Sequence, residues 1–167
     1  CLSNACLVTP EPEIRFAALC HSLGKACLPP SSWPELTDYS QASLTQVNHL
    51  CDRYKVGQRY RDIAQLTAKF HKLIQQAKTL TPSALLDLLA ATDALRRPER
   101  FLSAVLAAEA CLIQPQAPLN LVDFFKPLID VVRAAKPTAI MLNKTVPALK
   151  DAMHAARLNA LTAALKS

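Results

Sequence analysis

The scarcity of glycine constrains the fold of this chain more than any other feature of its sequence. Only two glycines, Gly24 and Gly57, occur in 167 residues. Sheets with many tight turns usually need more, because several turn types require a positive φ angle. Alanine and leucine are abundant while aromatic residues make up 5% of the chain, and this composition favours helices. We therefore predict an all-α protein.

Apolar residues recur at helical spacing over most of the chain, and the pattern predicts about seven helices. The first covers residues 13–23, and we expect Gly24 to follow it as a left-handed C-terminal cap. Another helix covers about residues 39–54, and the last covers about residues 146–165. These segments carry the apolar side chains that a helical core requires.

Two prolines mark further helix starts. Thr81 precedes Pro82 as an N-cap with proline at the first helical position, and Pro98 opens a helix in the same way. The segment QPQAPLN is the one evident linker. It divides the chain into a predicted helical domain, residues 1–113, and C-terminal helices, residues 114–167.

Composition limits the compartment and the partners. Hydrophobic residues make up 51% of the chain, which excludes a disordered protein, yet no apolar run is long enough to cross a bilayer. The six cysteines form no Cys-x-x-Cys pair, so we expect reduced thiols in a cytoplasmic protein rather than a zinc knuckle. A net charge of +6 permits a polyanionic partner, but ordinary solubility charge explains it equally well.

The segment CHSLGK contains the residues that suggest chemistry. With aspartate in place of Ser22 it would read His-Asp-x-Gly-Lys, the centre of a metal-dependent phosphohydrolase site. His21 is a candidate ligand, and His71 lies on another predicted helix, followed by Lys72. These supply one or two ligands, fewer than the three that catalytic metal sites usually hold. We therefore favour the interpretation that both histidines are partly buried and hydrogen-bonded.

Several segments together resemble a known family. They are EIRFAALCHSLGK (13–25), PPSSWPE (29–35), HLCDRYKV (49–56), RDIAQLTAKFHKLI (61–74) and DALRRPERF (93–101). They are similar to the His-Asp domain of bacterial CCA-adding enzymes, the tRNA nucleotidyltransferases, in their enterobacterial multifunctional form. The resemblance extends more weakly to residues 134–161, which are similar to the closing helices of that family. It implies a helical His-Asp-like bundle followed by tail helices.

The resemblance also implies a site that has lost its chemistry. The family has His-Asp-Leu-Gly-Lys-Gly and Phe-His-Asp where this chain has His21 with Ser22 and His71 with Lys72. The family's histidine cluster after Trp-Pro is missing as well. We therefore treat these four residues as vestigial positions, and predict no catalytic residue, no metal ligand and no phosphohydrolase activity.

The same resemblance implies a role in RNA binding. The catalytic head of the family, which uses Mg²⁺ with ATP and CTP, has no counterpart here, so we interpret the chain as a C-terminal fragment that needs no cofactor itself. The expected partners are tRNA and the head domain of the same parent chain, with a homodimer as a further candidate assembly. Phosphate contacts would give affinity without sequence readout. The candidate contacts are Arg96, Arg97, Arg100, Lys144, Lys150 and Arg157.

Two other functions remain open. One is a phosphohydrolase with atypical ligands, for which Asp38, His49 and Asp52 are the nearby candidates. The other is a helical module that binds a protein through one apolar stripe, although such a stripe is more often part of a core. The stripe consists of Leu121, Phe124, Phe125, Leu128, Val131 and Val132.

Overall fold

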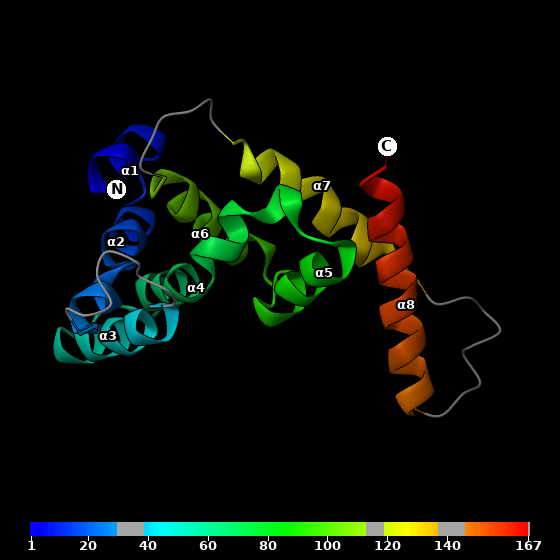
Figure 1. Cartoon of the computed structure of the whole chain (residues 1–167), viewed down its shortest axis with the longest axis horizontal. Helices are drawn as coiled ribbons and strands as arrows, with labels where there is room; N and C mark the ends of the chain where they lie inside the picture. Colours follow the sequence, from blue (N-terminus) through cyan, green and yellow to red (C-terminus); the bar gives the residue numbers. More distant parts are fainter. Residues whose placement is uncertain (30–38, 113–118, 137–145, 167) are drawn as a thin grey trace.

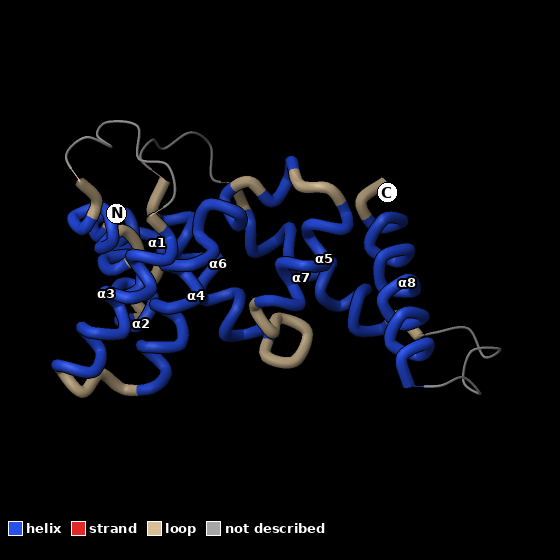
Figure 2. Tube along the Cα trace, turned by 60° about the horizontal axis from the view of Figure 1, so that its bottom comes forward, coloured by secondary structure: helices blue, strands red, loops and turns tan. Residues whose placement is uncertain are grey.

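The chain folds into a bundle of eight α-helices and two short 3₁₀ helices in the residues that the computed structural model describes (Figure 1). Those residues are 1–29, 39–112, 119–136 and 146–166, and they contain no strand (Figure 2). The prediction of an all-α protein is confirmed. The α-helices are α1 (Leu2–Val8), α2 (Pro12–Cys20), α3 (Ser40–Arg53), α4 (Gln58–Gln75), α5 (Pro82–Ala91), α6 (Pro98–Ala110), α7 (Leu121–Ala134) and α8 (Val146–Ala164), and the 3₁₀ helices are η1 (Leu23–Cys27) and η3 (Ala77–Thr79).

Local capping explains where several helices begin. At the start of α5, the backbone N–H of Ala84 donates to Oγ1 of Thr81 at 3.3 Å, and Pro82 occupies the first turn. This satisfies one of the N–H groups that a helix start leaves without an intrahelical acceptor. Pro98 likewise opens α6, as its sequence position predicts. The short helix α1 was not among the predicted helices, because seven residues are too few to show a clear period.

Gly24 does not adopt the left-handed conformation that the sequence led us to expect. It lies inside η1, and no glycine among the described residues has a positive φ angle. Its role is close approach, because its backbone N–H donates to Oγ of Ser43 at 3.0 Å. A Cβ atom at this position would lie 2.2 Å from the backbone nitrogen of Ser43. Glycine is therefore required by the packing of η1 on α3 and not by a helix cap.

Gly24→Ala is expected to destabilise the protein by about 3 kcal/mol, because η1 must move away from α3 to admit the methyl group. Urea unfolding followed by circular dichroism measures this. The matched control is Gly57→Ala, since a Cβ atom at Gly57 meets nothing within 4 Å. The control should change stability by less than about 1 kcal/mol. Equal effects of the two substitutions would contradict the packing argument.

Two hydrophobic clusters make up the core. The first is formed by α1, α2, α3, α4 and one face of α6, and it includes Ile14, Val47 and Ile63. The second joins the end of α4, the other face of α6, and α5, α7 and α8, and includes Phe101 and Leu161. Helices α4 and α6 contribute to both clusters, so they link the two ends of the molecule in Figure 1. The division into domains at residues 113/114 stays a prediction.

The apolar stripe on α7 is mostly core, as its spacing favours. Leu121, Phe125, Leu128 and Val132 are buried in the second cluster, and Phe124 packs against it. Val131 is the exception on this stripe, with 37% of its surface exposed. The stripe therefore offers little apolar surface to a protein partner. In the part of the chain that the structure describes, no helix combines the length and apolar character needed to span a membrane.

Candidate functional site

His21 and His71 meet in the interior of the first cluster. His21 follows the end of α2, and His71 lies in the last turns of α4. Their rings are 5.1 Å apart between centroids, at 78° to each other, and 6% and 2% of the two residues are exposed. The structure thus brings together two residues that are 50 positions apart in the sequence, as a shared site would require.

Each imidazole has a backbone partner. Nδ1 of His21 lies 2.8 Å from the carbonyl oxygen of Ala18, and Nδ1 of His71 lies 3.1 Å from that of Thr67. A carbonyl oxygen only accepts, so each Nδ1 carries the proton and donates. Nε2 of a neutral His71 then accepts from the hydroxyl of Tyr39 at 3.1 Å. The prediction that both histidines are buried and hydrogen-bonded is confirmed.

Burial keeps both imidazoles uncharged. Removal from water disfavours the charged form, and this is the main cause that lowers the pKa of His21 and of His71. For His71 the proximity of His21 is the next cause, and its pKa falls to about 4. Both side chains are therefore neutral at pH 7. Neutral imidazole is the form that binds metal ions, so protonation does not prevent ligation here.

The residues around this pair do not fit the divalent ion that the His-Asp family holds. Ser22 offers a hydroxyl where the family has a bridging carboxylate. Nζ of Lys72 lies 4.2 Å from the centroid of the Tyr39 ring, and Nζ of Lys25 lies 4.9 Å from the same centroid. Two ammonium groups therefore flank the histidines, and hard divalent ions require oxygen ligands with negative charge. We assign no phosphohydrolase step to these residues.

The two alternative ligands that the structure describes, His49 and Asp52, lie at the surface and add no ligand to this buried pair. Asp38 lies outside the described residues. His49 is exposed on α3, and exposed Asp52 forms an ion pair with Arg61. Within the described ranges, one group of three potential ligands does occur, formed by Cys1, His21 and Cys111 with ligand atoms within 4.8 Å of one another. No local sequence pattern points to this group, because the three residues share no short spacing.

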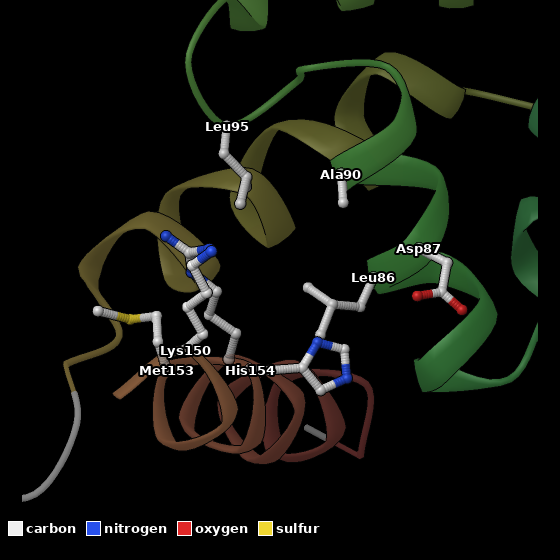
Figure 3. A pocket seen from close by; sticks show the side chains of 8 residues that line it. Leu86, Asp87, Ala90, Leu95, Lys150, Met153 and His154 are labelled. Atoms are coloured by element: carbon white, nitrogen blue, oxygen red, sulfur yellow. The ribbon is translucent and has the colours of Figure 1, made fainter. Parts of the chain in front are cut away.

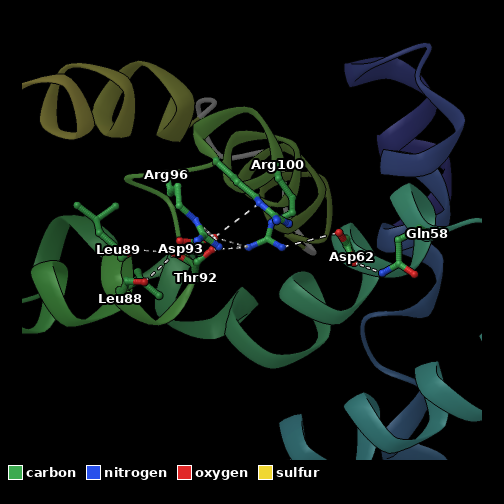
Figure 4. Close-up of polar contacts among 9 residues, drawn as sticks. Gln58, Asp62, Leu88, Leu89, Thr92, Asp93, Arg96 and Arg100 are labelled. Carbon is green, nitrogen blue, oxygen red and sulfur yellow. Dashed lines mark hydrogen bonds and ion pairs between the residues drawn. The ribbon is translucent and has the colours of Figure 1, made fainter. Parts of the chain in front are cut away.

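The predicted arginine cluster lies between α5 and α6. Arg96, Arg97 and Arg100 do not extend freely from the start of α6 but gather around one carboxylate (Figure 4). Oδ2 of Asp93 lies 3.0 Å from Nη2 of Arg96, 3.8 Å from Nε of Arg97 and 3.9 Å from Nη2 of Arg100. Sequence reasoning placed these arginines at a helix start but missed Asp93 as their shared counter-ion. The Asp-Ala-Leu-Arg-Arg spacing could have revealed it.

Arg100 also lines an open pocket of about 580 Å³ against α4 and α6. Its Nη2 donates to the carbonyl oxygen of Thr92 at 3.0 Å, and its Nη1 lies 3.8 Å from Oδ2 of Asp62. Its Nε is buried and has no hydrogen-bond partner among the described residues. The pocket is lined by Arg59, Asp62, Ile63, Arg97, Glu99, Arg100 and Ser103.

A second basic pocket, of about 270 Å³, lies between α5 and α8 (Figure 3). Lys150 and His154 project from α8 into the pocket, and the His154 ring lies beside Leu86 of α5. Arg157 also lines it, and Nε of Arg157 is the other buried side-chain nitrogen that has no hydrogen-bond partner in the described part of the chain. The sequence analysis named Lys150 and Arg157 as candidate tRNA contacts but did not include His154. Lys144 lies outside the described residues.

The two pockets share a chemistry that suits anions. Each is open to solvent, lined by at least two cationic side chains, and holds one buried guanidinium N–H without an acceptor. Guanidinium groups bind phosphate in a planar, two-point geometry. Acidic side chains line each pocket as well, Asp87 in one and Asp62 with Glu99 in the other. These carboxylates reduce the positive field, so phosphate binding depends on geometry as well as on net charge.

Comparisons with known proteins add no assignment. No protein-family model matches the chain. No solved structure matches it either. The similarity to CCA-adding enzymes therefore rests on the segments quoted above, and it remains a prediction from the sequence.

Proposed function

We propose that this chain binds RNA through its two arginine-containing pockets, and that it is the head-less C-terminal part of a CCA-adding tRNA nucleotidyltransferase. One observation carries this proposal. The two buried side-chain nitrogens that have no hydrogen-bond partner among the described residues belong to Arg100 and Arg157. Both arginines are in the set that the sequence predicted for tRNA contacts, and both line a pocket.

Such buried nitrogens favour a bound acceptor. A buried donor without an acceptor costs about 1–3 kcal/mol, and more when the group is charged. A phosphate oxygen at the pocket wall would supply the acceptor and a counter-charge together. RNA presents phosphates in series, so a strand can engage both pockets at once. Binding of this kind does not read sequence, which suits a protein that accepts every tRNA.

The position of the two pockets supports a polyanion rather than a single phosphate. The first lies against α4 and α6 in the middle of the molecule, and the second lies between α5 and α8 toward one end (Figure 1). A ligand that uses both must extend along the molecule. In this proposal the partners are tRNA and the head domain of the parent chain. Mg²⁺, ATP and CTP belong to that head and not to this chain.

Asp93→Asn is expected to raise affinity for tRNA about three- to tenfold, because it frees Arg96, Arg97 and Arg100 from a competing carboxylate and removes a repulsive charge. Asparagine tolerates the left-handed conformation of this residue, whose φ angle is 57°. Filter binding with two unrelated tRNAs at low salt measures the effect. Arg96 and Arg97 are exposed and Asp93 and Arg100 are half-buried, so the fold should lose no more than about 1 kcal/mol.

The matched control is Asp130→Asn, which makes the same charge change at an exposed position on α7. Its effect on tRNA affinity should be less than about twofold. An equal gain in both variants would assign the effect to net charge. Unchanged or weaker binding by Asp93→Asn would count against the arginine pocket as an RNA site.

A further inference from the structure

We propose that Cys1, His21 and Cys111 form a binding site for Zn²⁺. The three residues come from three helix ends, namely the start of α1, the end of α2 and the end of α6. Their ligand atoms all lie within 4.8 Å of one another. The site is separate from the two arginine pockets, and no ligand of the His-Asp pattern other than His21 takes part.

The separation of two of these ligand atoms is compatible with zinc. Sγ of Cys111 lies 3.3 Å from Nδ1 of His21. Zinc binds thiolate sulfur at about 2.3 Å and imidazole nitrogen at about 2.0 Å, so this separation corresponds to a sulfur–zinc–nitrogen angle of roughly 100°. A tetrahedral site requires an angle close to this value. The His21 ring must turn away from the carbonyl oxygen of Ala18 so that its Nδ1 lone pair faces the ion. Sγ of Cys1, within 4.8 Å of the other two ligand atoms, then completes a three-ligand set.

The fold holds the backbones of the three ligand residues close together without the ion. Helix α1 is attached to the end of α6, because Nδ2 of Asn4 donates to the carbonyl oxygen of Leu112 at 3.3 Å. Sγ of Cys1 lies 3.7 Å from the carbonyl oxygen of Cys111. The side chain of Ala5 is fully buried against the first cluster, which fixes the face that α1 presents. Ligands that come from packed helix ends are preorganised for binding.

The donor set selects a soft cation. Thiolates and imidazole suit zinc, whereas magnesium and calcium prefer oxygen ligands. Cys1, Cys111 and His21 provide two sulfur atoms and one nitrogen, and all six cysteines are free. Three protein ligands leave a fourth position for water, the arrangement of a zinc site that is open on one side.

Binding requires a defined exchange of protons. Each thiol releases its proton to solvent and ligates as a thiolate. Nδ1 of His21 now donates to the carbonyl oxygen of Ala18, and the thiol of Cys111 lies 3.6 Å from the same oxygen. On binding, the imidazole proton moves to Nε2 and Nδ1 exchanges Ala18 for the ion. Two zinc–thiolate bonds and one zinc–imidazole bond compensate for the loss of the hydrogen bond to Ala18.

The test uses the full 167-residue chain, stripped of metal and kept reduced with a phosphine. Titration calorimetry with ZnCl₂ should give one ion per chain and a higher midpoint of thermal unfolding. Titration with CoCl₂ should give the near-ultraviolet absorption band of cobalt–thiolate bonds. Cys1→Ser should weaken zinc binding by at least about tenfold and reduce this band. Because Cys1 is exposed, this variant keeps the core intact.

Two cysteine variants serve as controls. Cys6→Ser changes an exposed thiol on α1, and Cys51→Ala changes a buried thiol on α3; both should bind zinc as the unaltered chain does. The proposal is overturned if the reduced chain binds no zinc, or if Cys1→Ser and a folded Cys111→Ala variant bind it with unchanged affinity. Equal binding of MgCl₂ would overturn it as well.

Discussion

Replacing Arg96, Arg97 and Arg100 together by alanine is expected to weaken tRNA binding on the order of 100-fold at low salt, from about 1 kcal/mol for each lost phosphate contact. The salt dependence should change with it. Each phosphate contact contributes roughly 0.7–0.9 to the slope of log affinity against log salt, so the loss of three contacts should flatten the slope by about two to three units. Filter binding from low to moderate salt, with two unrelated tRNAs and a DNA duplex, measures both quantities.

A second set of substitutions tests the pocket on α8. Lys150→Ala with Arg157→Ala should flatten the slope further, and Lys144→Ala can be added although this residue lies outside the described part of the chain. The control for the arginine triple removes three exposed cations elsewhere, so it lowers the net charge by the same amount as that triple. It consists of Lys126→Ala, Arg133→Ala and Lys166→Ala.

The controls decide how the result is interpreted. The control triple should lose less than about threefold in affinity, because exposed charges away from the pockets act only through a screened field. Equal losses in the arginine triple and the control triple would mean that the positive charge is ordinary surface. Equal affinity for tRNA and the DNA duplex, with an unchanged slope in every variant, would require withdrawal of the tRNA proposal.

Phe101→Ala is expected to reduce the free energy of unfolding by about 3–5 kcal/mol. Phe101 is fully buried on α6 and meets Phe125 of α7 edge-on, with ring centroids 4.9 Å apart and planes at 87°. The substitution removes both the buried apolar surface and this aromatic contact. The thermal midpoint should fall by about 10 °C, at roughly 2–4 °C for each kcal/mol in a chain of this size.

Circular dichroism during urea and thermal unfolding measures this loss. Leu19→Ala is the control, because Leu19 is an apolar residue on α2 with 55% of its surface exposed. It should change stability by less than about 0.5 kcal/mol. A loss below about 1 kcal/mol for Phe101→Ala would contradict the packing of α6 against α7.

Helix starts and core faces were predictable where the signal is local. Thr81 with Pro82 defines the start of α5 in any context, because the cap involves only neighbouring residues. Ile63, Phe70 and Ile74 share the buried face of α4, as their spacing predicts. Leu19 shows the limit of this reasoning. It has the same apolar character as its neighbours, yet none of the described helices covers it, and 55% of its surface is exposed.

Gly24 shows a second limit. A glycine after an apolar helical run is typical of a left-handed cap, but here the residue allows η1 to approach Ser43 of α3. The sequence between residues 24 and 43 contains no sign of this contact. Which of two roles a glycine serves depends on the partner that packs against it, and the partner is set by the tertiary fold.

The candidate sites also combine features that the local sequence shows with features that only tertiary packing decides. The sequence by itself determined an all-α fold, the identity of the basic residues, and that Ser22 and Lys72, not carboxylates, follow His21 and His71 along the chain. Only the tertiary structure decided that Asp93 lies among the arginines and that Cys111 lies beside His21, 90 positions away. Helical period and capping act within a few residues, so they can be read along the chain. Distances between side chains on different helices depend on how those helices pack, and no local pattern records that packing.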